Sequence, residues 1–120
     1  MNSAELEDRL IEFAASIIKF TNTIPKNAAG IVLSNQILRS GISPALNYGE
    51  SRAAESQKDF VHKIRLVLKE LRETLVNLKI IQKSINLKEP LILENLILEN
   101  NELISIFVST IKTLVNKIIK

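Results

Sequence analysis

Apolar residues recur at steps of three and four along most of this chain, and three short segments interrupt the pattern. The interruptions are NTIPKN at residues 22–27, the polar stretch before residue 56, and LKEP at residues 87–90. The pattern therefore predicts four helices, beginning at Ser3, about Asn27, Ser56 and about Pro90. Four long helices with short connections pack most simply side by side. We predict an all-α fold, an antiparallel up-and-down four-helix bundle that forms a single domain over residues 1–120.

Each predicted helix carries a stripe of apolar residues that we expect to face the core. In the first helix the stripe is Leu6, Leu10, Phe13, Ile17 and Phe20. In the second it is Ile31, Leu38, Ile42 and Ala45. In the third it is Phe60, Ile64, Val67, Leu68, Leu71, Leu75, Leu78 and Ile85. In the fourth it is Leu96, Leu103, Phe107, Ile111, Leu114 and Ile118.

A proline interrupts the second predicted helix, which extends to Arg52. Pro44 cannot donate a backbone hydrogen bond to the carbonyl of Ser40, and its ring crowds that carbonyl. Two structures are compatible with this: one kinked helix, or a break in which Ser43 caps a new helix. The apolar spacing continues in register across Pro44, and this favours the kink.

Local signals mark the start of the third and fourth helices. Ser56-Gln57-Lys58-Asp59 resembles a capping box with Asp in the usual place of Glu, and we expect this helix to end near Asn86. Pro90 suits the first turn of a helix. The five-residue sequence LILEN occurs twice, at 91–95 and 96–100, and five residues do not match a helical period. We interpret the repeat as a local duplication and not as a solenoid.

The composition limits the cellular compartment that we expect and the kinds of chemistry that the side chains can perform. There is no cysteine, so disulfides and cysteine metal sites are excluded. The first ten residues are acidic and polar, unlike a secretory signal, and the apolar runs are too short to span a bilayer. We therefore expect a cytoplasmic protein without a membrane partner.

The charges are unevenly distributed. Residues 1–18 carry four acids and one base, a net charge of −3, whereas residues 19–88 carry twelve bases and five acids, a net charge of +7. Any polyanionic partner would be expected to meet this central part of the chain.

Catalytic chemistry has little support in the sequence. His62 is the one histidine, and no glycine-rich phosphate loop is present. Asp59-x-x-His62 occurs once, whereas a carboxylate metal site in a bundle uses a pair of such motifs. His62 is expected on the surface. We predict no enzymatic activity, no metal and no cofactor.

Basic residues form a band on one side of the third predicted helix. At 100° per residue they fall within roughly 60° of Lys58, opposite the apolar stripe. The band consists of Lys58, Arg65, Lys69, Arg72, Lys79 and Lys83. A line of like charge suits the phosphate backbone of a nucleic acid, without sequence specificity because no aromatic residues interleave with it. An ordinary solvated face would have the same pattern.

A line of polar residues runs along the second predicted helix. It contains Arg39, Ser43, Asn47 and Glu50, and if it faced the third helix it could meet Glu70 or Glu73. A network of these six residues would fix the register of the two helices. A binding pocket is the alternative, and Gly41 and Gly49 fit a close approach of helices in either case.

Residues 38–75 carry a family resemblance. The matching motifs are Leu38-Arg39-Ser40, Ser43, Asn47 with Glu50, Ser56 with Asp59-Phe60, Leu68-Lys69-Glu70, and Glu73-Thr74. In these motifs the chain resembles the four-helix-bundle proteins encoded within intervening sequences of bacterial 23S ribosomal RNA. It is similar, more distantly, to the accessory variability proteins of diversity-generating retroelements.

The resemblance implies a bacterial protein that assembles with itself, often as a ring-shaped homopentamer, and that has a basic surface and a suspected nucleic-acid role. It implies no established enzymatic activity. Taken with the basic band, it favours a self-assembling protein that binds RNA or DNA. The alternative is an oligomeric scaffold that binds another protein through Val76 and Ile80, which lie beside the band.

Overall fold

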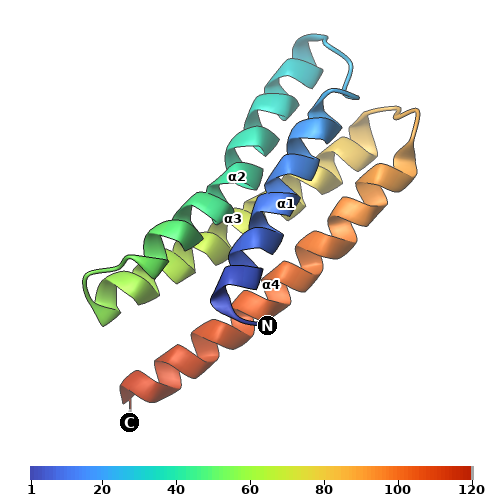
Figure 1. The fold of residues 1–120 in the computed structure, drawn as a ribbon. Helices are drawn as coiled ribbons and strands as arrows, with labels where there is room; N and C mark the ends of the chain where they lie inside the picture. Colours follow the sequence, from blue (N-terminus) through green and yellow to red (C-terminus); the bar gives the residue numbers. More distant parts are fainter. Residues whose placement is uncertain (120) are drawn as a thin grey trace.

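Four helices account for almost all of the chain (Figure 1). The computed structural model describes residues 1–119, and side chains as far as residue 117. Helix α1 spans Ser3–Thr21, α2 spans Ala28–Arg52, α3 spans Gln57–Ser84 and α4 spans Pro90–Ile119. The described residues contain no strand. The helices pack as a four-helix bundle that extends over 50 × 22 × 22 Å, as the sequence predicted.

Polar caps set the beginnings of three helices. The side-chain oxygens of Asn2, Asn27 and Ser56 each accept a hydrogen bond from the backbone N–H three residues on, at 2.8, 2.8 and 3.0 Å. These bonds satisfy N–H groups that have no partner inside the helix. The predicted starts agree with the structure to within one residue, and α3 ends two residues before the predicted Asn86.

The chain turns back at each of its three loops (Figure 1). α2 lies between α1 and α3, and α4 packs against α3 and closes the bundle on α1. The closure includes an ion pair in which Arg9 of α1 donates to Glu99 and Glu102 of α4, at 2.7 and 3.0 Å. None of the described helices is both long enough and apolar enough to cross a membrane.

The core is formed by the predicted stripes of α1, α3 and α4. All five stripe residues of α1 are buried. The described stripe residues of α3 and α4 are buried except for six that are half-buried: Phe60, Leu68, Leu75, Ile85, Ile111 and Leu114. The side chain of Ile118 lies outside the described part. The fully buried residues of these two helices include Ile64, Val67, Leu71, Leu78, Leu103 and Phe107.

The buried side of α2 is not the predicted one. Ile31 is 53% exposed, and Leu38, Ile42 and Ala45 are only half-buried. The side that faces the core is made mostly of small and polar residues: Gly30, Ile37, Ser40, Gly41, Pro44, Tyr48 and Ser51. The prediction failed because it followed the large apolar residues, whereas small residues decide where neighbouring helices come closest.

Gly41 shows the closeness of this packing. A Cβ atom added there would lie 2.9 Å from both Cγ atoms of Ile17 in α1, nearer than carbon atoms can approach without a shift. α2 also continues through Pro44 from end to end, so the interpretation of a break with Ser43 as a cap is wrong. The kink at Pro44 stays a prediction.

The two LILEN copies lie within α4 and have different environments. Five residues turn a helix by about 500°, so the second copy is rotated by about 140° from the first. Asn95 is exposed while its counterpart Asn100 is fully buried, and Leu91 is exposed while Leu96 is buried. The duplicated segment therefore contributes two different faces to one helix and does not form a repeating unit.

Candidate functional site

The basic band lies on the outer side of α3. All six of its members, Lys58 to Lys83, are exposed. They extend along about 37 Å of helix at 1.5 Å per residue. The core-facing side of α3 holds Ile64, Val67 and Leu71 at zero exposure, and burial of this side directs the cations outward.

The basic residues of the described chain divide into paired and unpaired groups. Arg9, Arg39, Arg52 and Lys63 each form an ion pair that joins two helices. No ion pair involves any of the six residues of the basic band within the described residues. The paired residues link the helices of the bundle. The charges of the basic band remain available to a partner or to solvent.

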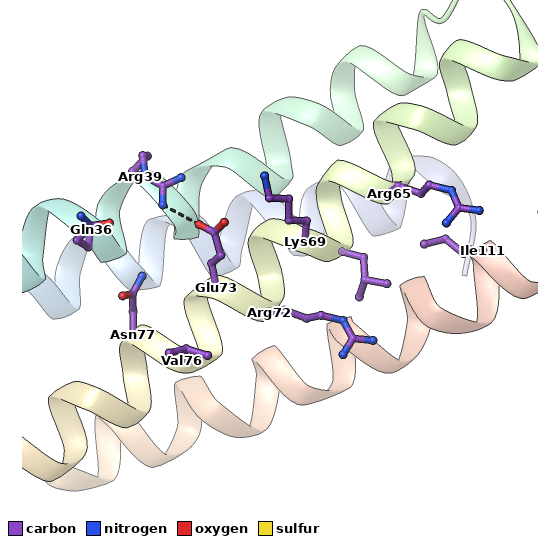
Figure 2. A pocket seen from close by; sticks show the side chains of 10 residues that line it. Gln36, Arg39, Arg65, Lys69, Arg72, Glu73, Val76, Asn77 and Ile111 are labelled. Carbon is purple, nitrogen blue, oxygen red and sulfur yellow. Dashed lines mark hydrogen bonds and ion pairs between the residues drawn. The ribbon is translucent and has the colours of Figure 1, made fainter.

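A groove of about 630 Å³ runs beside the middle of the basic band (Figure 2). Arg65, Lys69 and Arg72 line it from α3. Leu68 and Val76 of α3 and Ile111 of α4 give it apolar surface. Figure 2 shows Arg65 and Arg72 extending toward α4, whereas Lys69 extends toward α2. The groove thus combines cations with an apolar floor formed by Leu68, Val76 and Ile111. The sequence pattern of α3 alone does not predict this floor, because Ile111 belongs to α4.

Arg39 of α2 bridges two carboxylates of α3. Its guanidinium donates to Glu70 at 3.1 Å and to Glu73 at 2.7 Å (Figure 2 shows the Glu73 bond). The hydrogen bond to Glu73, and then the negative charge of both carboxylates, raise the pKa of Arg39 above its ordinary value. Because the Arg39 side chain is 54% exposed, this bridge lies at the solvent edge of the α2–α3 contact and not inside the core.

The other members of the predicted polar network do not join this bridge. The Asn47 amide donates to the hydroxyl and the carbonyl of Ser43, at 2.9 and 3.1 Å, one turn back in the same helix. Glu50 accepts from Lys63 of α3 at 3.4 Å. The predicted line is therefore three separate groups along one seam, two of which connect α2 to α3.

One contact between these helices was missed. Ser40 has no exposed surface, and its hydroxyl accepts a hydrogen bond from the amide of Asn77 at 3.0 Å. A serine and an asparagine 37 positions apart carry no signal of pairing in a single sequence. Lys63, the partner of Glu50, is not a member of the predicted network, and it lies on the side of α3 away from the basic band.

The described residues do not form a metal-binding site. They contain no cluster of three or more His, Asp or Glu side chains that could hold an ion. His62 is exposed, as expected from its position opposite the stripe.

The fold and the site define a class: a small four-helix bundle whose third helix presents cations, unpaired within the described residues, beside a groove with an apolar floor. Residues 4–109 match the family described as 23S rRNA-intervening sequence protein. The chain belongs to this family, as its sequence motifs indicated.

A solved structure supports the same assignment. It is the crystal structure of a protein with unknown function from the S23 ribosomal protein family of Bacteroides thetaiotaomicron. The two chains are 31% identical with a TM-score of 0.81, and the similarity covers 93% of this chain and 99% of the other. No curated protein matches this chain.

Proposed function

We propose that this protein binds RNA or DNA through the basic band of α3, without base-sequence specificity and without catalysis, and that copies of it assemble with one another. The observation that carries the proposal is the set of six exposed cations on one helix face, unpaired within the described residues. The related crystal structure is described as belonging to a ribosomal protein family, which agrees with an anionic partner.

Electrostatics explains why this arrangement suits a nucleic acid. Each cation that meets a phosphate releases a condensed counterion, and this release drives binding regardless of base sequence. A straight helix keeps its cations in a fixed line, so that several phosphates of one backbone can be met at once. The line of charge alone gives no base readout, because phosphate contacts carry no sequence information.

Exposed apolar residues on α1 and α2 support self-assembly. Ile11 and Ile18 are seven residues apart on α1 and therefore point almost the same way. On α2, Ile31, Val32 and Leu46 are more than half exposed. Such exposed apolar surface favours association with another molecule. A second copy would cover it and would bring a second basic band into the same particle.

Salt dependence tests the proposal directly. If all six cations meet phosphates, the logarithm of the affinity should fall with the logarithm of salt concentration with a slope of about −4 to −5. The double variant Lys69→Glu, Arg72→Glu should weaken binding strongly and flatten this slope. Fluorescence anisotropy with labelled RNA and DNA measures both effects.

A matched control separates the basic band from net charge. Lys19→Glu with Lys26→Glu makes the same change in net charge on α1 and its following loop, both residues being exposed. We expect this control to retain most of the affinity. Binding that is absent, or flat from low to moderate salt, contradicts the proposal.

An oligomeric scaffold for a partner protein is the second candidate. Val76 is 57% exposed and Ile80 is 45% exposed, beside the basic band. If this surface serves a protein, reversal of Lys69 and Arg72 would disturb assembly or capture of that protein while the chain showed no affinity for nucleic acid. Light scattering and anisotropy on the same double variant distinguish the two candidates.

A further inference from the structure

The groove beside the basic band has surface that phosphate binding does not use. Leu68, Val76 and Ile111 come from two helices and present side chains that cannot interact with phosphates. Val76 is more than half exposed, so water covers this surface in the free protein. A partner that met only the cations would leave the floor wet and would gain nothing from it.

The cations that line the groove lie directly beside its apolar floor. Arg65, Lys69 and Arg72 all line the groove, and about 10 Å of helix separates the first from the last. Glu73 lines it as well, but its carboxylate is paired with Arg39, so the lining keeps a positive net charge. An occupant therefore has to carry repeated negative charge at short spacing and apolar surface between or beside the charges. Charge complementarity excludes a neutral apolar ligand, and the apolar floor disfavours an anion without apolar surface.

Amide groups lie at one end of the same groove. Asn77 and Gln36 line it, from α3 and α2 respectively (Figure 2). The Asn77 amide nitrogen donates to the Ser40 hydroxyl at 3.0 Å, while the side-chain carbonyl oxygen of Asn77 accepts no hydrogen bond from the described residues. That oxygen and the exposed Gln36 amide can pair with the polar edge of a flat heterocycle that rests on the floor.

A duplex does not satisfy these conditions, because its bases are stacked and paired and its outer surface is phosphate and sugar. An unpaired strand does, since its bases expose both their flat faces and their polar edges. Arginine guanidinium groups also stack on such faces, and Arg65 and Arg72 border the floor. A volume of about 630 Å³ lies within the range of pockets that hold drug-sized molecules, large enough for a nucleotide unit.

We infer that the groove binds a single-stranded segment of nucleic acid, with phosphates on Arg65, Lys69 and Arg72 and a base over Leu68, Val76 and Ile111. This inference rests on the proposed nucleic-acid function and adds to it a preference for unpaired over paired strands. The absence of aromatic residues in the basic band argued against base contacts. The tertiary structure supplies the base-sized apolar surface from aliphatic side chains of two helices instead.

Three probes with equal numbers of phosphates test the inference: a short RNA strand without self-complementarity, an RNA duplex, and a strand of the same length with abasic positions. At one salt concentration we expect the strand to bind about tenfold more tightly than either of the others. Anisotropy titrations measure all three affinities on the full chain.

A pair of variants locates the effect in the groove. Val76→Ser removes apolar floor at an exposed position and changes no charge, so it should lower the affinity for the strand and leave the affinity for the duplex unchanged. Ile80→Ser makes the same kind of change at an exposed position of α3 that does not line the groove, and it should change neither. Circular dichroism checks that both variants remain folded.

The outcomes separate this inference from the proposed function. If duplex or abasic strand binds as tightly as the intact strand, or if Val76→Ser behaves as Ile80→Ser does, the base-binding inference is overturned while the basic band keeps its role. If none of the three probes binds, the proposed function fails, and the inference fails with it.

Discussion

Asn100 is a polar side chain in the middle of an apolar core. It has no exposed surface, and its amide nitrogen donates to the backbone carbonyl of Leu71 in α3 at 3.0 Å. Its side-chain oxygen has no hydrogen-bond partner among the described residues. A buried acceptor without a partner costs about 1–3 kcal/mol, because its hydration is lost and nothing replaces it.

Replacement of Asn100 by leucine should therefore stabilise the protein. Leucine has the same number and branching of side-chain heavy atoms as asparagine, and the Leu71 carbonyl keeps its hydrogen bond within α3. We expect the free energy of unfolding to rise by about 1–2 kcal/mol, measured by chemical denaturation. A decrease would mean that the hydrogen bond from Asn100 to the Leu71 carbonyl stabilises the fold by more than its unpaired oxygen destabilises it. Asn100 would then hold α3 and α4 in register.

Tyr48 gives the protein a pH dependence at high pH. Burial is the main cause that raises its pKa above the ordinary value, while nearby Arg52 opposes this effect and Glu7 adds to it. The folded protein therefore holds the phenol proton more tightly than the unfolded chain does. Its contribution to stability is complete below about pH 10 and is lost as the pH rises through the folded pKa.

This tyrosine can be observed alone, because the chain has one tyrosine and no tryptophan. We expect tyrosinate absorbance to titrate at higher pH in the folded protein than in denaturant. The variant Tyr48→Phe keeps the edge-on contact with Phe107, at 5.7 Å between ring centroids, and should lose less stability than the wild type above pH 10. Equal losses in the two proteins would contradict this role for Tyr48.

At the scale of elements, the contact between α1 and α2 depends on a missing side chain. Gly41→Ala would place a methyl group against the branched side chain of Ile17 in the core. We expect a loss of about 1–3 kcal/mol of unfolding free energy, partly offset by the better helix propensity of alanine. Thermal or chemical denaturation measures the loss. Ile17→Ala, which removes both contacting Cγ atoms, should cost less stability in the Gly41→Ala chain than in the wild type.

Gly49→Ala in the same helix is the matched control. Its added methyl group would meet only the carboxylate end of Glu7, at 3.0 Å, and that flexible side chain can move away. The higher helix propensity of alanine then dominates, and we expect the free energy of unfolding to rise by up to about 1 kcal/mol. If both variants lose stability equally, propensity and local strain in α2, and not contact with Ile17, would explain the effect of Gly41.

At the scale of the whole molecule, assembly should depend on the apolar side of α1 and α2. The double variant Ile31→Gln, Leu46→Gln removes apolar area at exposed positions without changing charge. We expect a lower particle mass by light scattering, unchanged helicity, and weaker binding of long nucleic acids because linked basic bands no longer act together.

The control for assembly lies on α4. Leu91→Gln with Leu98→Gln makes the same chemical change at two equally exposed leucines. We expect this variant to keep the particle mass of the wild type. If the α4 variant dissociates and the α2 variant does not, the assembly surface is on α4. If both retain the mass of a single chain that the wild type also shows, self-assembly is excluded.

Much of the fold could be predicted from the sequence because it depends on interactions within one helix. Caps such as Ser56 act over three residues, and apolar periodicity marks the buried side wherever that side is made of large residues, as in α1, α3 and α4. The outward direction of Arg65, Lys69 and Arg72 followed from the same periodicity. The family assignment also came from local motifs, and it is shown by the match over residues 4–109.

The sequence alone determined the four helices, their beginnings, and the side of α3 on which the cations lie, since each follows from neighbours a few residues apart. The tertiary structure decided which side of α2 is buried, because close approach favours Ser40 and Gly41 over larger residues that lie elsewhere on the helix. It also decided which charges are paired and where a groove exists. These features join residues 13 to 93 positions apart, whose meeting depends on how the helices pack and not on the pattern along any one of them.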